Sequence, residues 1–361
     1  MSGDAFRPLS ADDALRGGIG RLFIVGIPGT GLDAATRQTL EALGPGGVIL
    51  FRRNVGTVEE LRELTRQLHA LPSCPLVCID HEGGRVLRVD EPFTRFPPAA
   101  AVGRSGRPEI AYRVGRAMAA ELASVGIDLN FAPVLDVHSN PANPVIGDRS
   151  FAPDPTLAAA MGVALMRGLL DDGVLPCGKH FPGHGDTETD SHLELPVVRR
   201  SRAELEATEL VPFRAAIAAG IPLLMTAHVV YPALDPDVPA TISRRVLHQL
   251  LRIEMGFDGV IASDDLEMRA ITDGRTIGDA AVASLRAGAD VLLVCQDLAR
   301  AVAAVGAVEA AVRQGGLAAG AIVDALARMA RLRSMRRMSE MTACELPNPA
   351  HRQLLQEIGQ V

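Results

Sequence analysis

The chain has 361 residues, of which 48% are hydrophobic and 22% are charged, and its formal net charge is −7. This apolar content can build a large folded core and excludes compositional disorder. The acidic balance and the low aromatic content, 3% with no Trp, exclude a basic nucleic-acid surface and stacking platforms for single strands. We therefore expect no nucleic-acid partner.

Cysteine usage and the terminal segment favour a cytoplasmic protein. The five cysteines are scattered and form no C-x-x-C pair, which fits buried thiols in a reducing compartment better than disulfides or a thiolate metal site. The first residues include acidic side chains and no apolar run, so they do not resemble a signal peptide. No apolar stretch reaches the length of a membrane helix, and no membrane partner is expected.

Short β-branched apolar runs alternate with longer stretches of helical period from residue 21 to about residue 340. The runs, which predict strands buried on both faces, span 21–27, 46–53, 75–82, 128–137, 175–182, 221–229, 258–266 and 289–295. The predicted helices between them include 57–70, 109–125, 155–172, 201–219, 243–255 and 277–287.

Eight such strands, each followed by a helix, predict an α/β protein with a single (β/α)8 TIM-type barrel. An open doubly wound sheet is the alternative. Chemistry-bearing residues follow many of the strands, as a barrel requires: Asp80, Asp136, Lys179 with His180, His228 and Asp264. We expect one catalytic domain over 1–361, with an irregular or short helical tail from about residue 342.

The fifth strand is followed by the densest group of ionisable residues in the chain. Residues 179–192 read KHFPGHGDTETDSH and carry seven ionisable side chains in fourteen positions. This predicts a mobile loop that brings acid and base groups to a substrate, the alternative being a solvated polar loop. His180 and His184 have zinc-ligand spacing on a helix, but Pro182 and Gly183 between them break such a helix. We expect no metal and no cofactor.

Two further clusters of charged residues follow predicted strands: one is a pair of carboxylates, and the other combines a carboxylate with arginines. Asp264 and Asp265 close the seventh run, and strand alternation predicts that only one faces the barrel mouth while the other caps or pairs locally. The segment from Asp80 to Arg88, DHEGGRVLR, combines a carboxylate with guanidinium donors, which suits a polyhydroxylated ligand. Arg149 adds a second cationic donor. For each arginine alone, a surface ion pair is the alternative.

These motifs resemble the β-N-acetylhexosaminidases of glycoside hydrolase family 3. The resemblance rests on DHEGGRVLR, on KHFPGHG followed by DSH, and on SDDLEM, with NFAPVLDV, IGDRSF, MTAHV and GFDGVI in the expected order. It extends from about residue 20 to residue 340 and is nearest to the single-domain bacterial enzymes of peptidoglycan recycling. Two small departures are His81, where Gln is more frequent, and Ala152, where Gly is frequent.

The resemblance implies a role for each matching residue. Asp264 corresponds to the nucleophile, His192 to the general acid/base, and Asp190 to the carboxylate that supports it. The positions that correspond to sugar-binding residues are Asp80, Arg88, Arg149, Lys179 and His180. An imidazole with an ordinary pKa of roughly 6.5 can donate and then accept a proton near neutral pH. A neighbouring carboxylate fixes its tautomer.

The implied activity is a retaining exo-β-N-acetylglucosaminidase that cleaves terminal N-acetylglucosamine from muropeptides through a covalent glycosyl-Asp intermediate. A phosphorylase or a β-glucosidase of the same fold remains an alternative, and a sugar-binding barrel without turnover is the non-enzyme alternative. The expected partner is a small carbohydrate, and the expected state is a monomer or weak homo-oligomer.

Overall fold

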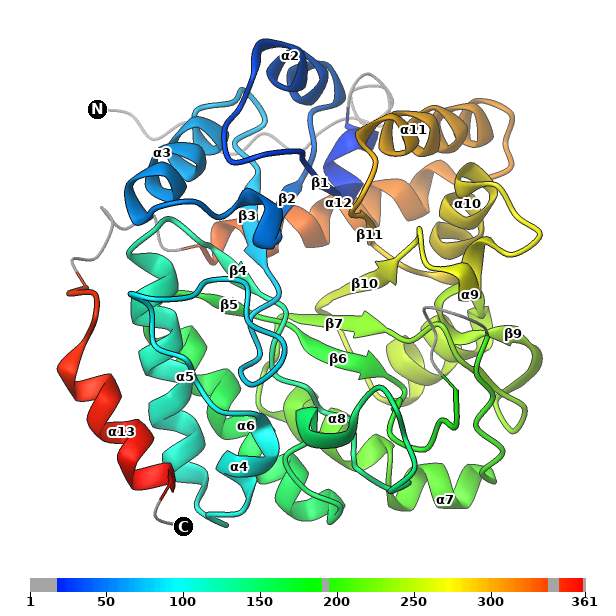
Figure 1. Ribbon diagram of the computed structural model, residues 1–361. Helices are drawn as coiled ribbons and strands as arrows, with labels where there is room; N and C mark the ends of the chain where they lie inside the picture. The colour runs from blue at the N-terminus through cyan, green and yellow to red at the C-terminus, as the bar shows by residue number, and fades with distance from the viewer. Residues whose placement is uncertain (1–17, 190–194, 337–343, 360–361) are drawn as a thin grey trace.

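The computed structural model describes residues 18–189, 195–336 and 344–359, and a ring of parallel strands occupies its centre (Figure 1). Each strand lies within one of the runs predicted from sequence. The strands are β1 (Phe23–Gly26), β2 (Gly47–Leu50), β3 (Leu76–Ile79), β4 (Leu129–Asn130), β5 (Leu175–Pro176), β6 (Gly178–Phe181), β7 (Leu223–Thr226), β10 (Val260–Asp265) and β11 (Val291–Val294).

The hydrogen-bonded order of the nine strands is β5-β4-β3-β2-β1-β11-β10-β7-β6. Its two ends are consecutive pieces of one segment, separated by Cys177, so the sheet closes on itself as an eight-membered barrel. On one side the neighbour stays the same across Cys177, because β5 pairs with β4 and Lys179 on β6 is bridged to Val134 in the segment that continues from β4. The predicted barrel fold is confirmed.

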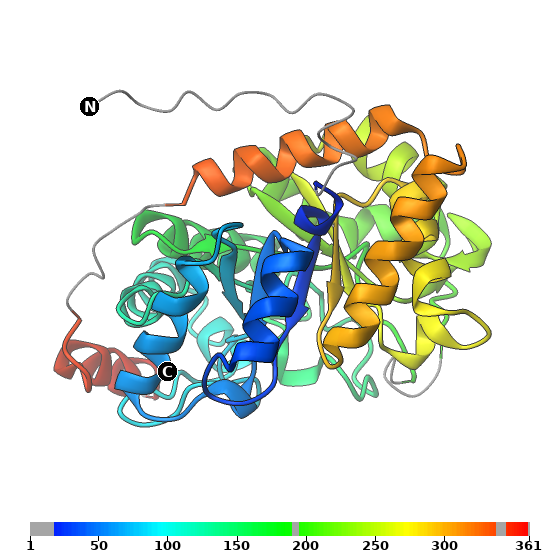
Figure 2. The ribbon, with the colours of Figure 1, turned by 90° about the horizontal axis from the view of Figure 1, so that it is seen from above.

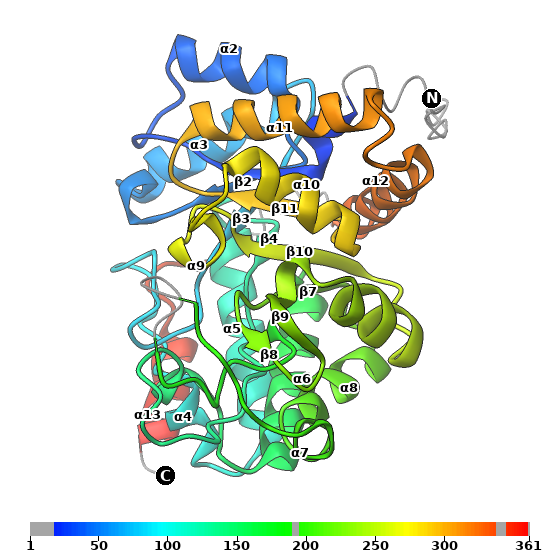
Figure 3. The same ribbon diagram turned by 90° about the vertical axis from the view of Figure 1, so that its right-hand side faces the viewer.

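Helices surround the strands on the outside (Figures 1 and 3). They are α2 (Ala34–Leu43), α3 (Val58–His69), α4 (Ala99–Gly103), α5 (Pro108–Ala123), α6 (Pro155–Asp171), α7 (Arg202–Ala207), α8 (Leu210–Ala218), η5 (Arg245–Glu254), α9 (Arg269–Thr272), α10 (Ile277–Ala287), α11 (Leu298–Arg313), α12 (Ala319–Ser334) and α13 (Pro349–Gly359). Capping boxes fix the starts of three of them: Thr57 with Glu60 at α3, Ser201 with Glu204 at α7, and Thr276 with Asp279 at α10.

The continuous helix predicted over 201–219 was wrong, because this stretch forms two helices, α7 and α8. The break falls at Thr208, whose backbone (φ −128°, ψ −76°) is not helical. Pro212 explains the position of the break, since a proline ring clashes with the carbonyl group four residues earlier. Glu209, at the break, has a fully buried side chain that accepts a hydrogen bond from the Ser139 hydroxyl at 3.0 Å.

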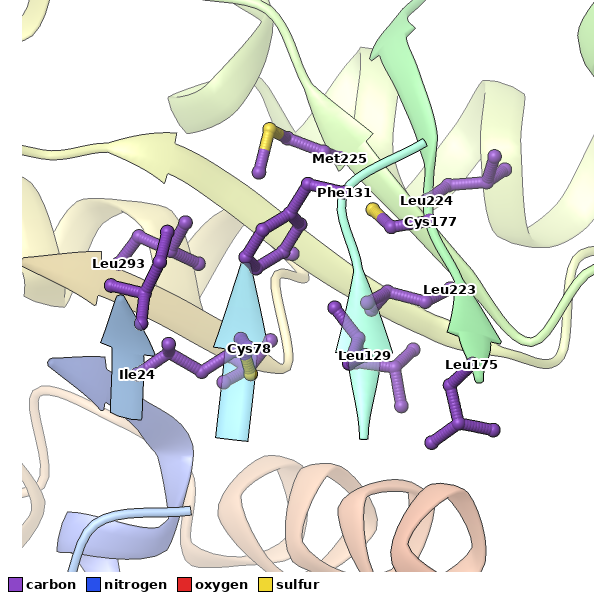
Figure 4. Close-up of a cluster of buried hydrophobic side chains, with 14 of the residues drawn as sticks. Ile24, Cys78, Leu129, Phe131, Leu175, Cys177, Leu223, Leu224, Met225 and Leu293 are labelled. Carbon is purple, nitrogen blue, oxygen red and sulfur yellow. The ribbon is translucent and has the colours of Figure 1, made fainter. Parts of the chain in front are cut away.

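The interior of the barrel is filled by apolar side chains rather than left as a channel (Figure 4). Ile24, Cys78 and Leu129, from β1, β3 and β4, are fully buried in this cluster. Phe131 and Met225 belong to the same cluster, and both also line the cavity described below. The packed core therefore forms the floor of the candidate site.

Two helices that follow the eighth strand–helix unit complete the fold. The long helix α12 runs along one side of the barrel (Figure 2), and its residue Arg328 pairs with the buried Asp290 at 3.1 Å. The helix α13 packs against α4 and α5 (Figure 1), with Leu354 and Ile358 buried. In the part of the chain that the structure describes, no helix is long and apolar enough to cross a membrane.

Candidate active site

A cavity of about 540 Å³ opens where the carboxyl ends of several strands meet. Six of the eight predicted site residues line it: Asp80, Arg88, Arg149, Lys179, His180 and Asp264. The other two, Asp190 and His192, lie outside the described residues. The volume falls within the range of small-ligand pockets, and its position is the one that barrel enzymes use for their active sites.

Lys179, on β6, lies at the centre of a buried ion-pair network. Its ammonium nitrogen is 2.5 Å from an Asp80 carboxylate oxygen and 2.6 Å from a Glu82 oxygen. Burial alone would lower the pKa of Lys179, but the two carboxylates outweigh burial and raise it. The second Asp80 oxygen accepts a hydrogen bond from Arg88 at 2.8 Å. Three of the predicted sugar-binding residues are thus in direct contact.

Glu82 belongs to the same network, and our sequence analysis missed it. It accepts two parallel hydrogen bonds from the Arg149 guanidinium, at 2.8 and 2.7 Å, besides its contact with Lys179. Burial opposes ionisation, but these two cations outweigh it and lower the pKa of Glu82. Alternate residues of an extended segment face the same side. The two-residue spacing between Asp80 and Glu82 could therefore have predicted that both side chains lie at the same site. Glu82 fixes both cations without itself lining the cavity.

Asp136, also missed as a site residue, orients His180. It is fully buried and lies 2.7 Å from Nδ1 of His180. A carboxylate only accepts hydrogen bonds, so Nδ1 carries the proton, and Nε2 is directed to the Arg149 guanidinium at 3.5 Å. Burial raises the pKa of Asp136, but His180 and the backbone amide of His184 outweigh it and lower the pKa. The His180 ring is therefore held in one orientation at the cavity wall.

Both Asp264 and Asp265 line the cavity, so the prediction that only one faces the barrel mouth was wrong. The pairing of β10 with β11 shifts register between Ala262 and Asp265, and such an irregularity interrupts the regular alternation of side chains. The expected local pairing is nevertheless present. One Asp265 oxygen accepts the amides of Glu267 at 3.0 Å and Cys295 at 3.2 Å.

The two neighbouring carboxyl groups differ in acidity. Burial raises the pKa of Asp265 to about 7. Burial acts on Asp264 as well, but the nearby imidazoles of His228 and His180 and the Asp265 amide outweigh it and lower its pKa. At neutral pH, Asp264 is therefore ionised, whereas Asp265 is only partly ionised. Adjacent groups whose surroundings separate their pKa values in this way are typical of active sites.

The described residues on both sides of 190–194 are anchored to neighbouring loops. The side-chain amide of Asn143 donates hydrogen bonds to the backbone oxygens of His184 and Gly185, at 2.9 and 3.0 Å. The ring of His184, considered above for zinc, contacts the Thr187 hydroxyl at 3.0 Å through Nδ1. On the other side of residues 190–194, the amide of Val198 donates a hydrogen bond to the backbone oxygen of Val230 in β8 (Val230–Tyr231) at 2.9 Å.

His81, a departure from the family pattern, does not line the cavity. Its backbone amide and carbonyl group both bond to the Asn130 side chain, at 2.9 and 2.8 Å. Burial lowers the pKa of His81 to about 4, so the ring is neutral at physiological pH. The neutral Nδ1 accepts the Arg88 backbone amide at 3.4 Å. His81 thus supports the position of Arg88.

An ionised carboxylate in a pocket lined by fixed hydrogen-bond donors and acceptors is an arrangement suited to sugar binding and attack at an anomeric carbon. Residues 15–332 match the family described as the glycosyl hydrolase family 3 N terminal domain. The β-hexosaminidase of Neisseria meningitidis serogroup C is 46% identical over 272 residues, 73% of this chain and 75% of that protein. The β-hexosaminidase of Nitrosospira multiformis is 43% identical over 281 residues, 76% of this chain and 80% of that protein.

Solved structures agree with the sequence relatives. A family 3 β-N-acetylglucosaminidase from Paenibacillus superposes with a TM-score of 0.91 at 38% identity, covering 95% of this chain and 67% of that one. NagZ from Neisseria gonorrhoeae, solved with N-trifluoroacetyl-D-glucosamine, has a TM-score of 0.81 at 37% identity, covering 94% and 97%. The chain belongs to glycoside hydrolase family 3, as the motifs predicted. Its activity class is that of a β-N-acetylhexosaminidase, and its substrate is a carbohydrate.

Variants of the binding residues test the proposed sugar contacts. We expect Arg88→Ala to lower kcat/KM by about 10- to 100-fold if Arg88 binds sugar, because such a donor would both bind and position it. Lys179→Ala, His180→Ala and Asp80→Ala should act in the same direction. The matched control is Arg95→Ala, since Arg95 lies on the same loop with its side chain 62% exposed. Steady-state kinetics on a nitrophenyl glycoside give the comparison. Near wild-type values for all four variants would contradict the assignment.

Proposed function

We propose that this enzyme is a retaining, exo-acting β-N-acetylglucosaminidase in which Asp264 is the nucleophile. The observation that carries the proposal is the ionised Asp264 in the cavity beside the proposed sugar-binding residues. Asp264 attacks the anomeric carbon as the bond from that carbon to the leaving oxygen breaks; the general acid protonates the leaving oxygen, and a glycosyl-Asp264 ester forms. Water then attacks the same carbon, loses a proton to the general base and releases the sugar with retained configuration.

We assign the proton transfers to His192 and its support to Asp190. This assignment rests on the DSH motif, because both residues lie outside the described part of the chain. An imidazole suits both directions of transfer near neutral pH. The Asp190 carboxylate would hold the imidazole in one tautomer and stabilise its protonated form, as in other Asp–His pairs.

Lys179, Asp80 and Arg88 would bind hydroxyl groups of the terminal sugar, with Arg149 and His180 completing the subsite. The apolar floor formed by Phe131 and Met225 closes the pocket at its inner end, which favours a terminal sugar over an internal one. The resemblance to single-domain enzymes of peptidoglycan recycling favours muropeptides that end in N-acetylglucosamine as the natural substrate.

A hydrolysis panel tests this proposal. We expect nitrophenyl β-N-acetylglucosaminide to be cleaved faster than the β-glucoside and the β-xyloside, and a muropeptide with terminal N-acetylglucosamine to release that sugar. Asp264→Ala protein, purified identically, controls for contaminating glycosidases. Preference for the glucoside would contradict the acetamido specificity. Formation of a sugar phosphate when inorganic phosphate is added would instead identify a phosphorylase.

A further inference from the structure

The helix α13 is joined to the active-site loop through one buried glutamate. Nδ1 of His351, on α13, lies 2.6 Å from a carboxylate oxygen of Glu121, a residue of α5 with a side chain only 2% exposed. The same carboxylate accepts the backbone amide of Thr94 at 2.8 Å and its hydroxyl at 2.5 Å. One carboxylate thus connects α13, α5 and the loop that follows β3.

That loop, residues 80–98, also carries Asp80 and Arg88, and its two halves are packed tightly against each other. The amide of Gly84 donates to the Phe96 carbonyl group at 2.9 Å. A Cβ atom on Gly83 would lie 2.4 Å from the Pro97 oxygen, so the close approach requires glycine there. A displacement of the half at 94–98 must therefore be transmitted to the half at 83–88.

We propose that His351 is a positioning residue for Arg88, acting through Glu121 and Thr94. The Phe96 ring lies 6.4 Å from the His351 ring, so His351 is linked to residues 94–98 directly through Phe96 and indirectly through Glu121. The proton on Nδ1 of His351 provides the donor that Glu121 needs beyond Thr94. Without that donor, the buried Glu121 carboxylate forms a hydrogen bond with a different group. The loop at residues 80–98, which carries Arg88, then loses its fixed position.

This inference rests on the proposed function, because that function assigns Arg88 to the sugar subsite. A double-mutant cycle of His351 and Arg88 tests the positioning role separately from the proposed function. With nitrophenyl β-N-acetylglucosaminide, we expect His351→Ala to raise KM about tenfold in the wild-type background and to lower kcat less. In the Arg88→Ala background, the same substitution should change KM less than twofold, because the group it positions is gone. Kinetics are normalised to the folded fraction measured by circular dichroism.

Two variants on α13 serve as controls. His351→Asn keeps an N–H donor near the position of Nδ1 and should restore most of the wild-type KM. Glu357→Ala removes an exposed ion pair with Arg113, 2.7 Å long, and should leave the kinetics unchanged while loosening the same helix. If His351→Ala does not fold, Thr94→Val removes one of the bonds to Glu121 and should show the same pattern on a smaller scale.

The possible outcomes separate the inference from the proposed function. Equal effects of His351→Ala in both backgrounds, or no effect in the wild-type background, would overturn the positioning role. A failure of the wild-type enzyme to cleave the acetamido substrate would instead overturn the proposed function. The cycle would then be run on whichever glycoside the panel selects.

Discussion

Replacing Asp264 with alanine is expected to lower kcat by a factor of about 10⁴ or more, because the covalent step loses its nucleophile. The fold should survive, since the 2.8 Å hydrogen bond from the Asp265 amide to Asp264 is local and the strand pairing of β10 does not depend on it. Turnover of the nitrophenyl substrate, with the thermal midpoint as a check on folding, measures both expectations.

Trapping of the intermediate identifies which carboxylate attacks. A 2-fluoro sugar with a good leaving group should form a stable ester, and peptide mapping should place it on Asp264. Asp265→Asn is the matched control, because it removes the neighbouring carboxyl group but keeps oxygen to accept the amides of Glu267 and Cys295. Labelling of Asp265 in the wild-type enzyme would show that the wrong member of the pair had been assigned.

Replacing His192 with alanine should give a loss of activity that depends on the leaving group. Removal of a general acid typically costs about 10²–10⁴ in rate. A sugar hydroxyl is a poor leaving group and needs the proton, so turnover of the natural substrate should nearly stop. A nitrophenolate leaves with little help, so its glycosylation step should be much less damaged. Hydrolysis of the intermediate should then limit turnover of the nitrophenyl substrate.

Added azide should rescue the His192→Ala variant by attacking the intermediate without general base assistance. Asp190→Ala should give the same pattern more weakly, because Asp190 orients the imidazole but does not carry the proton. Rates on both substrates with and without azide provide the measurement. Equal losses on both substrates and no azide effect would assign His192 a binding or structural role, and the proton donor would have to be another residue.

The barrel could be predicted from the sequence because the information is local. A strand buried on both faces leaves a continuous apolar run, and all the observed barrel strands fall within the predicted runs. The carboxyl ends of parallel strands share one rim, so strand-end residues such as Asp80 and Lys179 could be expected together before any contact was known. The break at Thr208 could also have been predicted, because Pro212 prevents a regular helix from including the residue four positions earlier.

The contacts between site residues could not be predicted in the same way. Period-two alternation assumes a regular strand, and the register shift in β10 that brings Asp264 and Asp265 to one cavity depends on its pairing with β11. Glu82 and Asp136 carry no local signal of the cations and imidazoles that they hold, because those partners come from distant segments of the chain. The link from His351 to Glu121 joins residues 230 positions apart in the chain.

The pairing that continues past Cys177, from β4 into the residues that follow it, joins two stretches of sequence to each other. The Leu135 amide bonds to the Lys179 oxygen at 2.7 Å, and the Lys179 amide bonds to the Pro133 oxygen at 3.2 Å. Asp136, carried by the same stretch, accepts the His180 amide at 3.1 Å. Residues 133–137 and 178–181 therefore form one structural unit. Anyone grafting the Lys–His pair onto another barrel must move both stretches, and in evolution a change in one restricts what the other can accept.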